Sequence, residues 1–285
     1  MGIQIDRAGE SQAMVDPTAL GVALFAALLV MTVVWALHLG EEDASIVDPV
    51  WAPAIVLTAL AYAGFLGRWP TGGRVVFLLV PLAWAARLSL YLAARHAHEG
   101  EDRRYRRMRE ARGDAWWWQS LYAVFWLQGG LATLVALPLM GLMTAGGDPG
   151  LLAWLGALLT LAGFFYEALA DGQLARFKRS EATRVGDPVE GHGSTPGGVL
   201  ESGLWRFSRH PNYFGEAVLW WGIGVTSWGL GAPFGLFGSV VITVLLLKVS
   251  GVALTESDIA SRRPEYVAYA RRTNAFLPGK PRTTD

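Results

Sequence analysis

The segment FSRHPNYFGE, residues 207–216, places several reactive side-chain types directly before an apolar run. Pro211 suits the first turn of a helix, so Arg209 and His210 are expected at a helix N-terminus. The helix dipole disfavours cations at this end, but cations and free backbone N–H groups together bind anions. These residues therefore predict an anion-binding site at the start of an apolar helix.

The residues after the proline add hydrogen-bonding groups to this site. Asn212 and Tyr213 follow Pro211 directly, and Glu216 lies about one helical turn beyond Asn212. Two ligands fit this composition. One is a phosphorylated small molecule, and the other is the headgroup of an anionic lipid.

Ionisable side chains also occur inside apolar segments, where lipid makes them costly and a functional role is expected by default. Arg87 shares a helical face with Trp84, Tyr91 and Arg95, at spacings of three and four residues. A lipid-facing arginine is implausible there, so Arg87 is expected to face the helix bundle, an anion or an acid. Lys248 lies near the end of its apolar run, where its side chain can extend to the polar interface.

Two acids lie four residues apart on another apolar segment. Glu167 and Asp171 share a helical face, and Lys178 follows on the same face. Two carboxylates at this spacing repel each other unless a cation or a hydroxyl-bearing ligand lies between them. A structural ion pair with Arg87 or Lys248 is the alternative explanation.

Asp48 opens the second apolar segment, directly before Pro49. It has two interpretations, a cap for the helix that Pro49 begins, or a catalytic carboxyl group. The chain has no cysteine, which excludes disulfides and thiolate chemistry. No HExxH motif or other metal-ligand spacing occurs, so no metal site is predicted.

The elements that must position these residues are long and apolar. The chain is 52% hydrophobic and 17% charged, with a mean hydropathy of +0.32. A membrane-spanning helix needs about 20 apolar residues. Seven segments approach this length, and they predict an all-α bundle of seven transmembrane helices. These segments are residues 19–38, 46–66, 74–94, 119–142, 150–170, 213–230 and 233–254.

Lysine and arginine are distributed unevenly among the connections between these segments. Nineteen lie on one side of the predicted seven-span layout and three on the other. Because basic loops remain in the cytoplasm, the C-terminus is predicted to be cytoplasmic and the N-terminus outside. The basic residues are split among loops that flank the membrane, which does not suit nucleic-acid binding.

The rest of the chain is organised around these spans. We expect an N-terminal tail over residues 1–18 and one membrane domain over residues 19–282. Within the domain, residues 99–118 are expected to form a cytoplasmic helix. The Gly-, Pro- and Ser-rich residues 179–203 are expected to form a cytoplasmic loop.

Several blocks together carry a resemblance to a known family. They include SIVDPVW, LARFKR, GLWRFSRHPNYFGEAVLWWG, LLLKVSGVALTE and RRPEYVAYARRTNAFLP. Over about residues 40–280, the chain resembles the bacterial membrane family grouped with the steroid 5-alpha-reductase C-terminal domain. The resemblance implies a multi-pass protein of the bacterial inner (plasma) membrane that binds NADPH in a cavity on the cytoplasmic side. It also implies reduction of a C=C bond conjugated to a carbonyl in a hydrophobic, lipid- or sterol-like substrate.

The resemblance also implies roles for individual residues. Asp48 and Tyr91 are the candidates for holding the substrate carbonyl and delivering a proton during catalysis. The residues implied in cofactor binding are Arg87, Glu167, Asp171, Lys178, Arg209, His210, Asn212, Tyr213, Glu216, Lys248, Glu256 and Tyr266.

Two other functions compete with the reductase. Isoprenylcysteine and phospholipid methyltransferases, which use S-adenosylmethionine, also carry an R-H-P-x-Y-x-G block, and RHPNYFG fits that pattern. Those enzymes usually have a paired EE before the C-terminal tyrosine block, whereas this chain has TESD. The second competing function is a lipid-binding membrane protein without catalytic activity.

Overall fold

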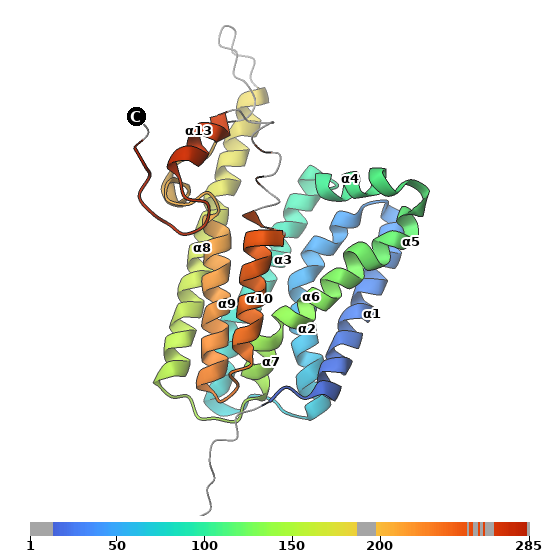
Figure 1. Ribbon diagram of the computed structural model, residues 1–285, viewed down its shortest axis with the longest axis vertical. Helices are drawn as coiled ribbons and strands as arrows, with labels where there is room; N and C mark the ends of the chain where they lie inside the picture. Colours follow the sequence, from blue (N-terminus) through green and yellow to red (C-terminus); the bar gives the residue numbers. More distant parts are fainter. Residues whose placement is uncertain are drawn as a thin grey trace, which may run out of the picture. The chain divides into compact units, whose positions relative to one another are not determined.

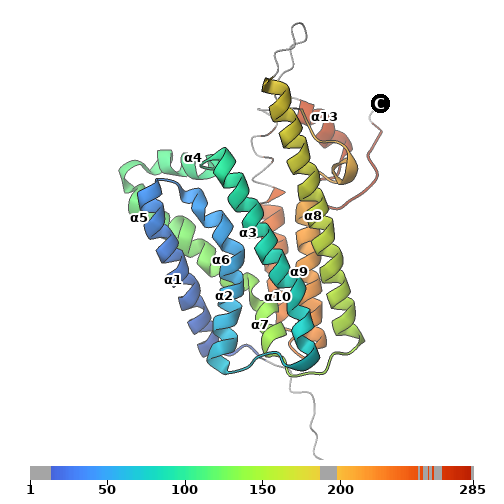
Figure 2. The same cartoon turned by 180° about the vertical axis from the view of Figure 1, so that it is seen from behind.

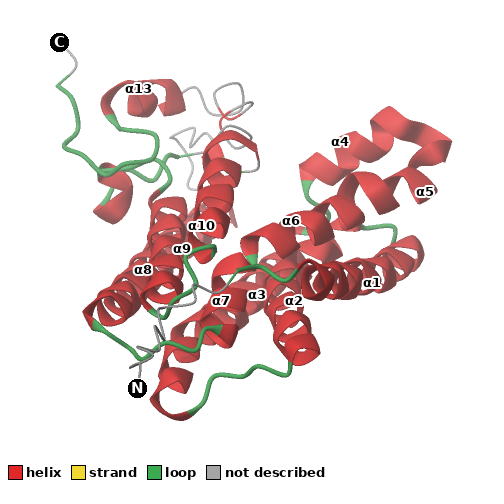
Figure 3. Cartoon of the chain, turned by 60° about the horizontal axis from the view of Figure 1, so that its bottom comes forward, coloured by secondary structure: helices red, strands yellow, loops and turns green. Residues whose placement is uncertain are grey.

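The computed structural model describes residues 14–186, 198–249, 251–252, 256, 259 and 265–283. All regular secondary structure in these residues is helical (Figure 3). The chain forms two compact units, and each is described by itself. Unit 1 comprises Met1–Ala157 and Ile223–Ser239, and unit 2 comprises Leu158–Gly222 and Val240–Asp285.

Unit 1 begins with three long helices, α1 (Pro17–Glu41), α2 (Asp48–Leu66) and α3 (Leu79–Glu99) (Figures 1 and 2). The side chain of Asp16 caps α1 by accepting a 2.8 Å hydrogen bond from the Ala19 N–H. Short 3₁₀ segments, Ala44–Val47 and Gly72–Leu78, precede α2 and α3. Helix α2 ends at Gly67, whose φ of 61° is left-handed and favours glycine.

The second part of unit 1 is a run of shorter helices. Helix α4 (Arg103–Arg112) is capped by Asp102, and α5 (Trp116–Ser120) follows it. A π-helical segment (Leu121–Trp126) joins α5 to α6 (Leu127–Val135). The next helix, α7 (Leu137–Thr144), is bent by 44° from the preceding helix. Pro138 in the first turn of α7 has no backbone N–H to continue the earlier ladder, which accounts for the bend.

Helix α1 has small residues on its packed face and large apolar residues outside. Ala19, Ala23 and Ala27 are at most 1% exposed, whereas Phe25 and Leu29 are more than half exposed. A soluble helix would cover its large apolar side chains. The opposite arrangement suits a helix that packs closely through small residues and faces lipid with large ones.

Three helices run through both units, and one more lies in unit 2. Helices α8 (Leu151–Gly186), α9 (Pro211–Gly229) and α10 (Gly235–Val244) each contribute residues to unit 1 and unit 2. A π-helical segment, Leu245–Val249, continues α10. Helix α13 (Glu265–Arg272) belongs to unit 2 and buries Tyr266 and Tyr269.

The all-helical prediction is confirmed for the described residues, and helices cover most of the described part of each predicted apolar segment. Four helices in the described chain are long and apolar enough to cross a membrane, and the bent pair that ends at Thr144 would make a fifth. Several apolar helices of this kind are compatible with a multi-pass membrane protein. Seven spans remain a prediction. The four candidate spans are Pro17–Glu41, Ala44–Leu66, Gly72–His98 and Leu151–Glu181.

The expected loop over residues 179–203 was wrong at its start. Helix α8 continues to Gly186, well beyond residue 179. Neither glycine nor proline interrupts the sequence between Gln173 and Val185, so nothing local stops the helix. Residues 187–197 of the expected loop lie outside the described part of the chain.

Candidate functional site

Helices α8 and α9 pack within unit 2 through glycines, and this packing positions the candidate site. A Cβ atom added to Gly163 on α8 would lie 2.3 Å from the backbone nitrogen of Leu219 on α9. A Cβ atom added to Gly215 on α9 would lie 2.5 Å from the nitrogen of Glu167 on α8. No side chain fits at these distances, so the two backbones approach each other directly.

The close packing brings together polar residues predicted from both helices. Glu167 and Asp171 of α8 are 2% and 5% exposed. Asn212, in the first turn of α9, donates a hydrogen bond of 3.2 Å from Nδ2 to Oδ1 of Asp171. The side-chain oxygen of Asn212 is buried and accepts no hydrogen bond from the part of the chain that the structure describes. Since a buried polar atom without a partner is uncommon, this oxygen is a candidate acceptor for a ligand.

Arg209, predicted to bind an anion, is engaged by the protein itself. Its guanidinium donates two hydrogen bonds to the carboxylate of Glu256, at 2.7 and 2.8 Å. It also donates to the carbonyl oxygens of Ala270 and Thr273, both at 2.8 Å. These carbonyls are at the C-terminal end of α13, where a cation stabilises the helix dipole. Arg209 therefore fixes α13 to the segment that precedes α9.

Glu256 is the centre of this second cluster in unit 2. Besides Arg209, its carboxylate lies 2.9 Å from Nε2 of His210 and accepts a 3.1 Å hydrogen bond from the Tyr266 hydroxyl. Burial alone would raise the pKa of Glu256, but the contacts with His210 and Arg209 outweigh it and lower the pKa to about 2. Tyr213 stacks on the His210 ring, with centroids 5.4 Å apart. Three residues of the segment FSRHPNYFGE thus form one cluster with Glu256 and Tyr266, which the resemblance alone had implied.

The geometry of this cluster bears on the predicted anion site. The positive charge of Arg209 is matched by the carboxylate of Glu256, and the side chain of Arg209 is only 12% exposed. A phosphate at this position would compete with Glu256 for the guanidinium. Contact between Arg209 and a cofactor therefore remains a prediction, while its structural role is seen directly.

The other predicted cofactor residues lie at the following places. Arg87 and Tyr91 are half-buried, about one turn apart on α3 in unit 1. Lys178 on α8 and Lys248 on the π-helical segment are exposed, and Glu216 on α9 is buried. Asp171 and Asn212 are in direct contact, whereas Arg87 belongs to the other unit.

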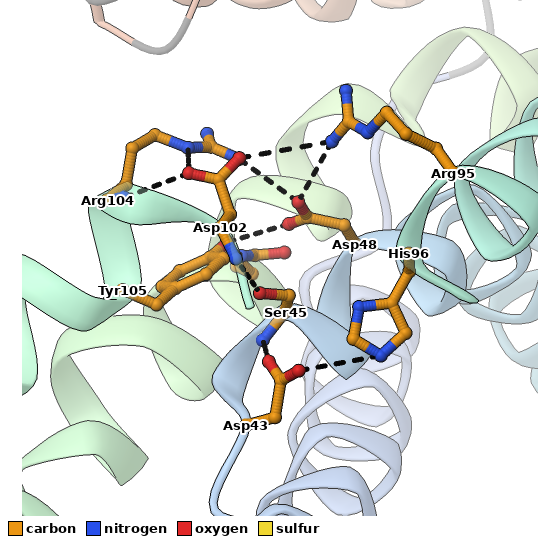
Figure 4. A network of polar contacts seen from close by, with 9 residues as sticks. Asp43, Ser45, Asp48, Arg95, His96, Asp102, Arg104 and Tyr105 are labelled. Carbon is orange, nitrogen blue, oxygen red and sulfur yellow. Dashed lines mark hydrogen bonds and ion pairs between the residues drawn. The ribbon is translucent and has the colours of Figure 1, made fainter. Parts of the chain in front are cut away.

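Asp48 anchors a separate polar cluster in unit 1 (Figure 4). Its carboxylate accepts a 2.7 Å hydrogen bond from the Tyr105 hydroxyl and a 3.0 Å hydrogen bond from Nη2 of Arg104. Arg95 of α3 lies 3.9 Å from the same carboxylate. Asp48 is the first residue of α2, yet its side chain binds α4 rather than capping its own helix.

Neighbouring polar groups hold this cluster in place. Gln128 donates a 3.0 Å hydrogen bond to the Tyr105 hydroxyl, which therefore both donates and accepts. Asp102 pairs with Arg104 at 3.0 Å, and its backbone N–H donates to the Ser45 hydroxyl at 2.7 Å. In the residues that the structure describes, no three histidine or acidic side chains gather in a way that could hold a metal ion.

Sequence reasoning missed Arg104, Tyr105 and Gln128. Tyr105 lies in the run RRYRR, which was expected only to form part of a cytoplasmic helix, and it is 57 residues from Asp48. Gln128 is a lone amide in the apolar run VFWLQGG. A polar side chain inside an apolar segment was the available signal for Gln128, whereas no local pattern links Tyr105 to Asp48.

Comparison with known proteins gives a family but no activity. An uncharacterized protein of Schizosaccharomyces pombe is 25% identical over 284 residues, which cover 90% of this chain and 79% of that protein. No solved structure matches the chain. Residues 34–273 match a family described as "Protein of unknown function (DUF1295)". This match spans most of the sequence and includes both polar clusters, and the chain therefore belongs to the DUF1295 family.

Proposed function

We propose that this protein is a membrane-embedded, NADPH-dependent reductase of a C=C bond conjugated to a carbonyl in a lipid- or sterol-like substrate. The observation that carries the proposal is the contact between Asp171 and Asn212. Two residues that the resemblance assigns to cofactor binding, 41 positions apart, are hydrogen-bonded beside the buried Glu167. The unused side-chain oxygen of Asn212 supplies a ready acceptor.

The residues around this contact fit the polar parts of a dinucleotide. Carboxylates and an amide oxygen accept hydrogen bonds from ribose hydroxyls and from a carboxamide NH₂ group. Asn212 and Asp171 would bind these groups, and the exposed Lys178 would face the phosphates. When bound, NADPH supplies the hydride. Arg209 is less suited to binding a phosphate of the cofactor, because its guanidinium already forms an ion pair with Glu256.

The cluster around Asp48 supports a role at the carbonyl end of the substrate. Hydride addition to an enone leaves negative charge on the oxygen, which a preorganised donor must stabilise. The hydroxyl of Tyr105 is buried in unit 1, where it donates its hydrogen to Asp48 and accepts a hydrogen bond from Gln128. We assign the donor role to Tyr105, whose hydroxyl hydrogen would turn from Asp48 to the substrate oxygen when the substrate binds. Tyr91, predicted from the sequence, is the alternative donor.

The membrane arrangement is part of the same proposal. The excess of basic residues on one side of the predicted spans supports a cytoplasmic C-terminus, an external N-terminus and seven spans. A bacterial inner membrane and a cofactor cavity on the cytoplasmic side follow from the resemblance.

One observation favours the S-adenosylmethionine-dependent methyltransferase as a second candidate. Arg209 and His210 of the RHPNYFG block contact Glu256 directly, and Glu256 in turn binds Tyr266 of the C-terminal block. The RHPNYFG block and the C-terminal tyrosine block of the methyltransferase pattern thus lie together around Glu256. This chain has one glutamate there, whereas those enzymes usually have two in succession.

Calorimetric titration of the purified protein separates these functions. The reductase predicts that NADPH binds with micromolar affinity and S-adenosylmethionine does not. Asn212→Ala and Lys178→Ala should each weaken NADPH binding about tenfold or more, equivalent to about 1.4 kcal/mol. Asn274→Ala is a matched control, because this residue of unit 2 contacts Arg282 at the surface.

Each other outcome has a definite meaning. Binding of S-adenosylmethionine alone would replace the reductase with the methyltransferase. Binding of neither compound would favour a lipid-binding protein without catalytic activity. NADPH binding that is unchanged in both variants would remove the site proposed here.

A further inference from the structure

A small cavity in unit 2 belongs to neither polar cluster. Its volume is about 250 Å³, and it is lined by Glu201, Arg206, Tyr269, Arg272, Thr273 and Pro281. Glu201 and Arg206 belong to the segment just before α9, and the other lining residues belong to α13 and the C-terminal segment. The cavity is therefore lined partly by the segment that leads into the apolar helix α9.

The cavity lining contains two arginines and one glutamate, so its net charge is positive. Arg272 forms an ion pair with Glu201. Arg206 is exposed and has no carboxylate partner among the residues that the structure describes. The hydroxyl of Tyr269 donates to the backbone carbonyls of Trp205 and Ser208. Tyr269 therefore lines the cavity, and its hydroxyl hydrogen is not available to a ligand. One unmatched positive charge remains, which suits an anion with a single negative charge.

Apolar side chains lie beside this charge. Phe207, under the guanidinium of Arg206, is 39% exposed, and Leu277 is 66% exposed. The Gly279 N–H donates a 3.0 Å hydrogen bond to the carbonyl of Phe207, which ties Phe207 to the C-terminal segment that carries Leu277. The surrounding surface is basic, with Arg271, Lys280 and Arg282 exposed. A ligand for this surface needs an apolar part as well as a negative charge.

We propose that this cavity binds the headgroup of an anionic phospholipid of the cytoplasmic leaflet. A phosphodiester has one negative charge, which matches the unpaired Arg206, and Arg272 provides a second contact. The glycerol and the start of the acyl chains contact Phe207 and Leu277. In the seven-span layout proposed above, α9 is a span, and the basic segment before it would lie at headgroup depth, where anionic lipids concentrate.

The site differs from the headgroup site considered for Arg209 on sequence grounds. Arg209 is bound to Glu256 and to the end of α13, whereas Arg206 is exposed and its charge is unmatched. Lipid binding here requires no cofactor and no turnover, so it stands or falls separately from the reductase proposal.

Native mass spectrometry of the detergent-purified protein tests the site, with dioctanoyl phosphatidylglycerol as the probe. Arg206→Gln should weaken binding about fivefold or more, as expected for losing one charge-assisted contact. Arg271→Gln is the matched control, because it removes the same charge from an exposed residue outside the cavity. Glu201→Gln should strengthen binding, because it removes the only negative charge of the lining.

The source of the phosphate is distinguished by competition. Glycerol 3-phosphate and inorganic phosphate should not displace the lipid at concentrations that saturate the lipid site, because they lack acyl chains. Displacement by either would overturn the lipid assignment in favour of a free phosphate. Equal binding by Arg206→Gln and Arg271→Gln would overturn the site itself, since both variants differ from the wild type by the same charge.

Discussion

Gly163 of α8 lies against the backbone of Leu219 on α9, so closely that a Cβ atom would come within 2.3 Å of the Leu219 nitrogen. The same helices carry Asp171 and Asn212, which are hydrogen-bonded further along the pair. The geometry of the candidate cofactor site therefore depends on how closely the backbones of α8 and α9 approach. Glycine at position 163 is a requirement of the site as well as of the fold.

This dependence predicts that Gly163→Ala is destabilising even though alanine favours helices. The new methyl group must push α9 away, at a cost of about 1–3 kcal/mol for overpacking. The midpoint of thermal unfolding in detergent should fall, and NADPH binding should weaken because Asn212 moves relative to Asp171.

Gly172→Ala on the same helix is the control for this prediction. A Cβ atom at Gly172 would have no atom within 4 Å. Its only expected effect is the better helix propensity of alanine, worth up to about 1 kcal/mol, so the midpoint should stay the same or rise. A Gly163→Ala protein as stable as the Gly172→Ala protein would mean that α8 and α9 are further apart than described.

The sequence was informative wherever the relevant pattern is local. Apolar runs predicted the helices, because a helix in lipid must be long and apolar over its whole length. The spacing of four residues predicted that Glu167 and Asp171 share a face, and both are buried. Helix α8 was predicted too short, because the Gly-, Pro- and Ser-rich composition of residues 179–203 was read as a loop from its first residue, although no glycine or proline occurs before Gly186.

Contacts between distant segments could not be predicted in the same way. Arg209 and Glu256 are 47 residues apart, and nothing near Arg209 indicates that its charge is matched. The dipole argument for an anion site treated the helix end as isolated, but Glu256 provides that anion within the protein. Tyr105 was missed for the same reason, since its partner Asp48 lies 57 residues earlier in the chain, on α2.

The cluster around Glu256 predicts how stability depends on pH. The pKa of Glu256 is lowered from 4.5 to about 2, so the folded state holds its proton less tightly than the unfolded state. The stabilisation is therefore complete above about pH 4.5 and is lost as the pH falls toward 2. The shift corresponds to about 3 kcal/mol for a side chain that is 24% exposed.

Glu256→Gln gives the measurement for this prediction. At pH 7 the variant should unfold at a lower temperature than the wild type, because Arg209 keeps its charge and loses its partner. The difference should shrink between pH 4.5 and pH 2, where the wild-type carboxylate becomes protonated. Glu265→Gln, an exposed residue of α13, is the control and should show no such convergence. A constant difference across this range would show that the charge of Glu256 does not stabilise the fold.

The cluster around Asp48 predicts which tyrosine acts at the substrate carbonyl. The Tyr105 hydroxyl is held between Asp48, to which it donates, and Gln128, from which it accepts. In the proposed reaction this hydrogen turns from Asp48 to the substrate oxygen, and removing a donor of this kind typically costs a factor of about 10²–10³ in rate. Tyr105→Phe should therefore lower the rate of NADPH oxidation with α,β-unsaturated lipid carbonyls by about this factor. The affinity for NADPH should be unchanged, because Tyr105 does not belong to the proposed cofactor site around Asp171 and Asn212.

Two further tyrosines make this experiment decisive. Tyr122→Phe alters a hydroxyl on a side chain that is 48% exposed, and the rate should not change. Tyr91→Phe tests the residue that the sequence alone favoured. If the rate falls in Tyr91→Phe and not in Tyr105→Phe, the proton donor lies on α3, and the Asp48–Tyr105 contact only fastens α4 to α2. If it falls in Tyr105→Phe alone, the donor lies on α4, because that hydroxyl is the one that Asp48 orients.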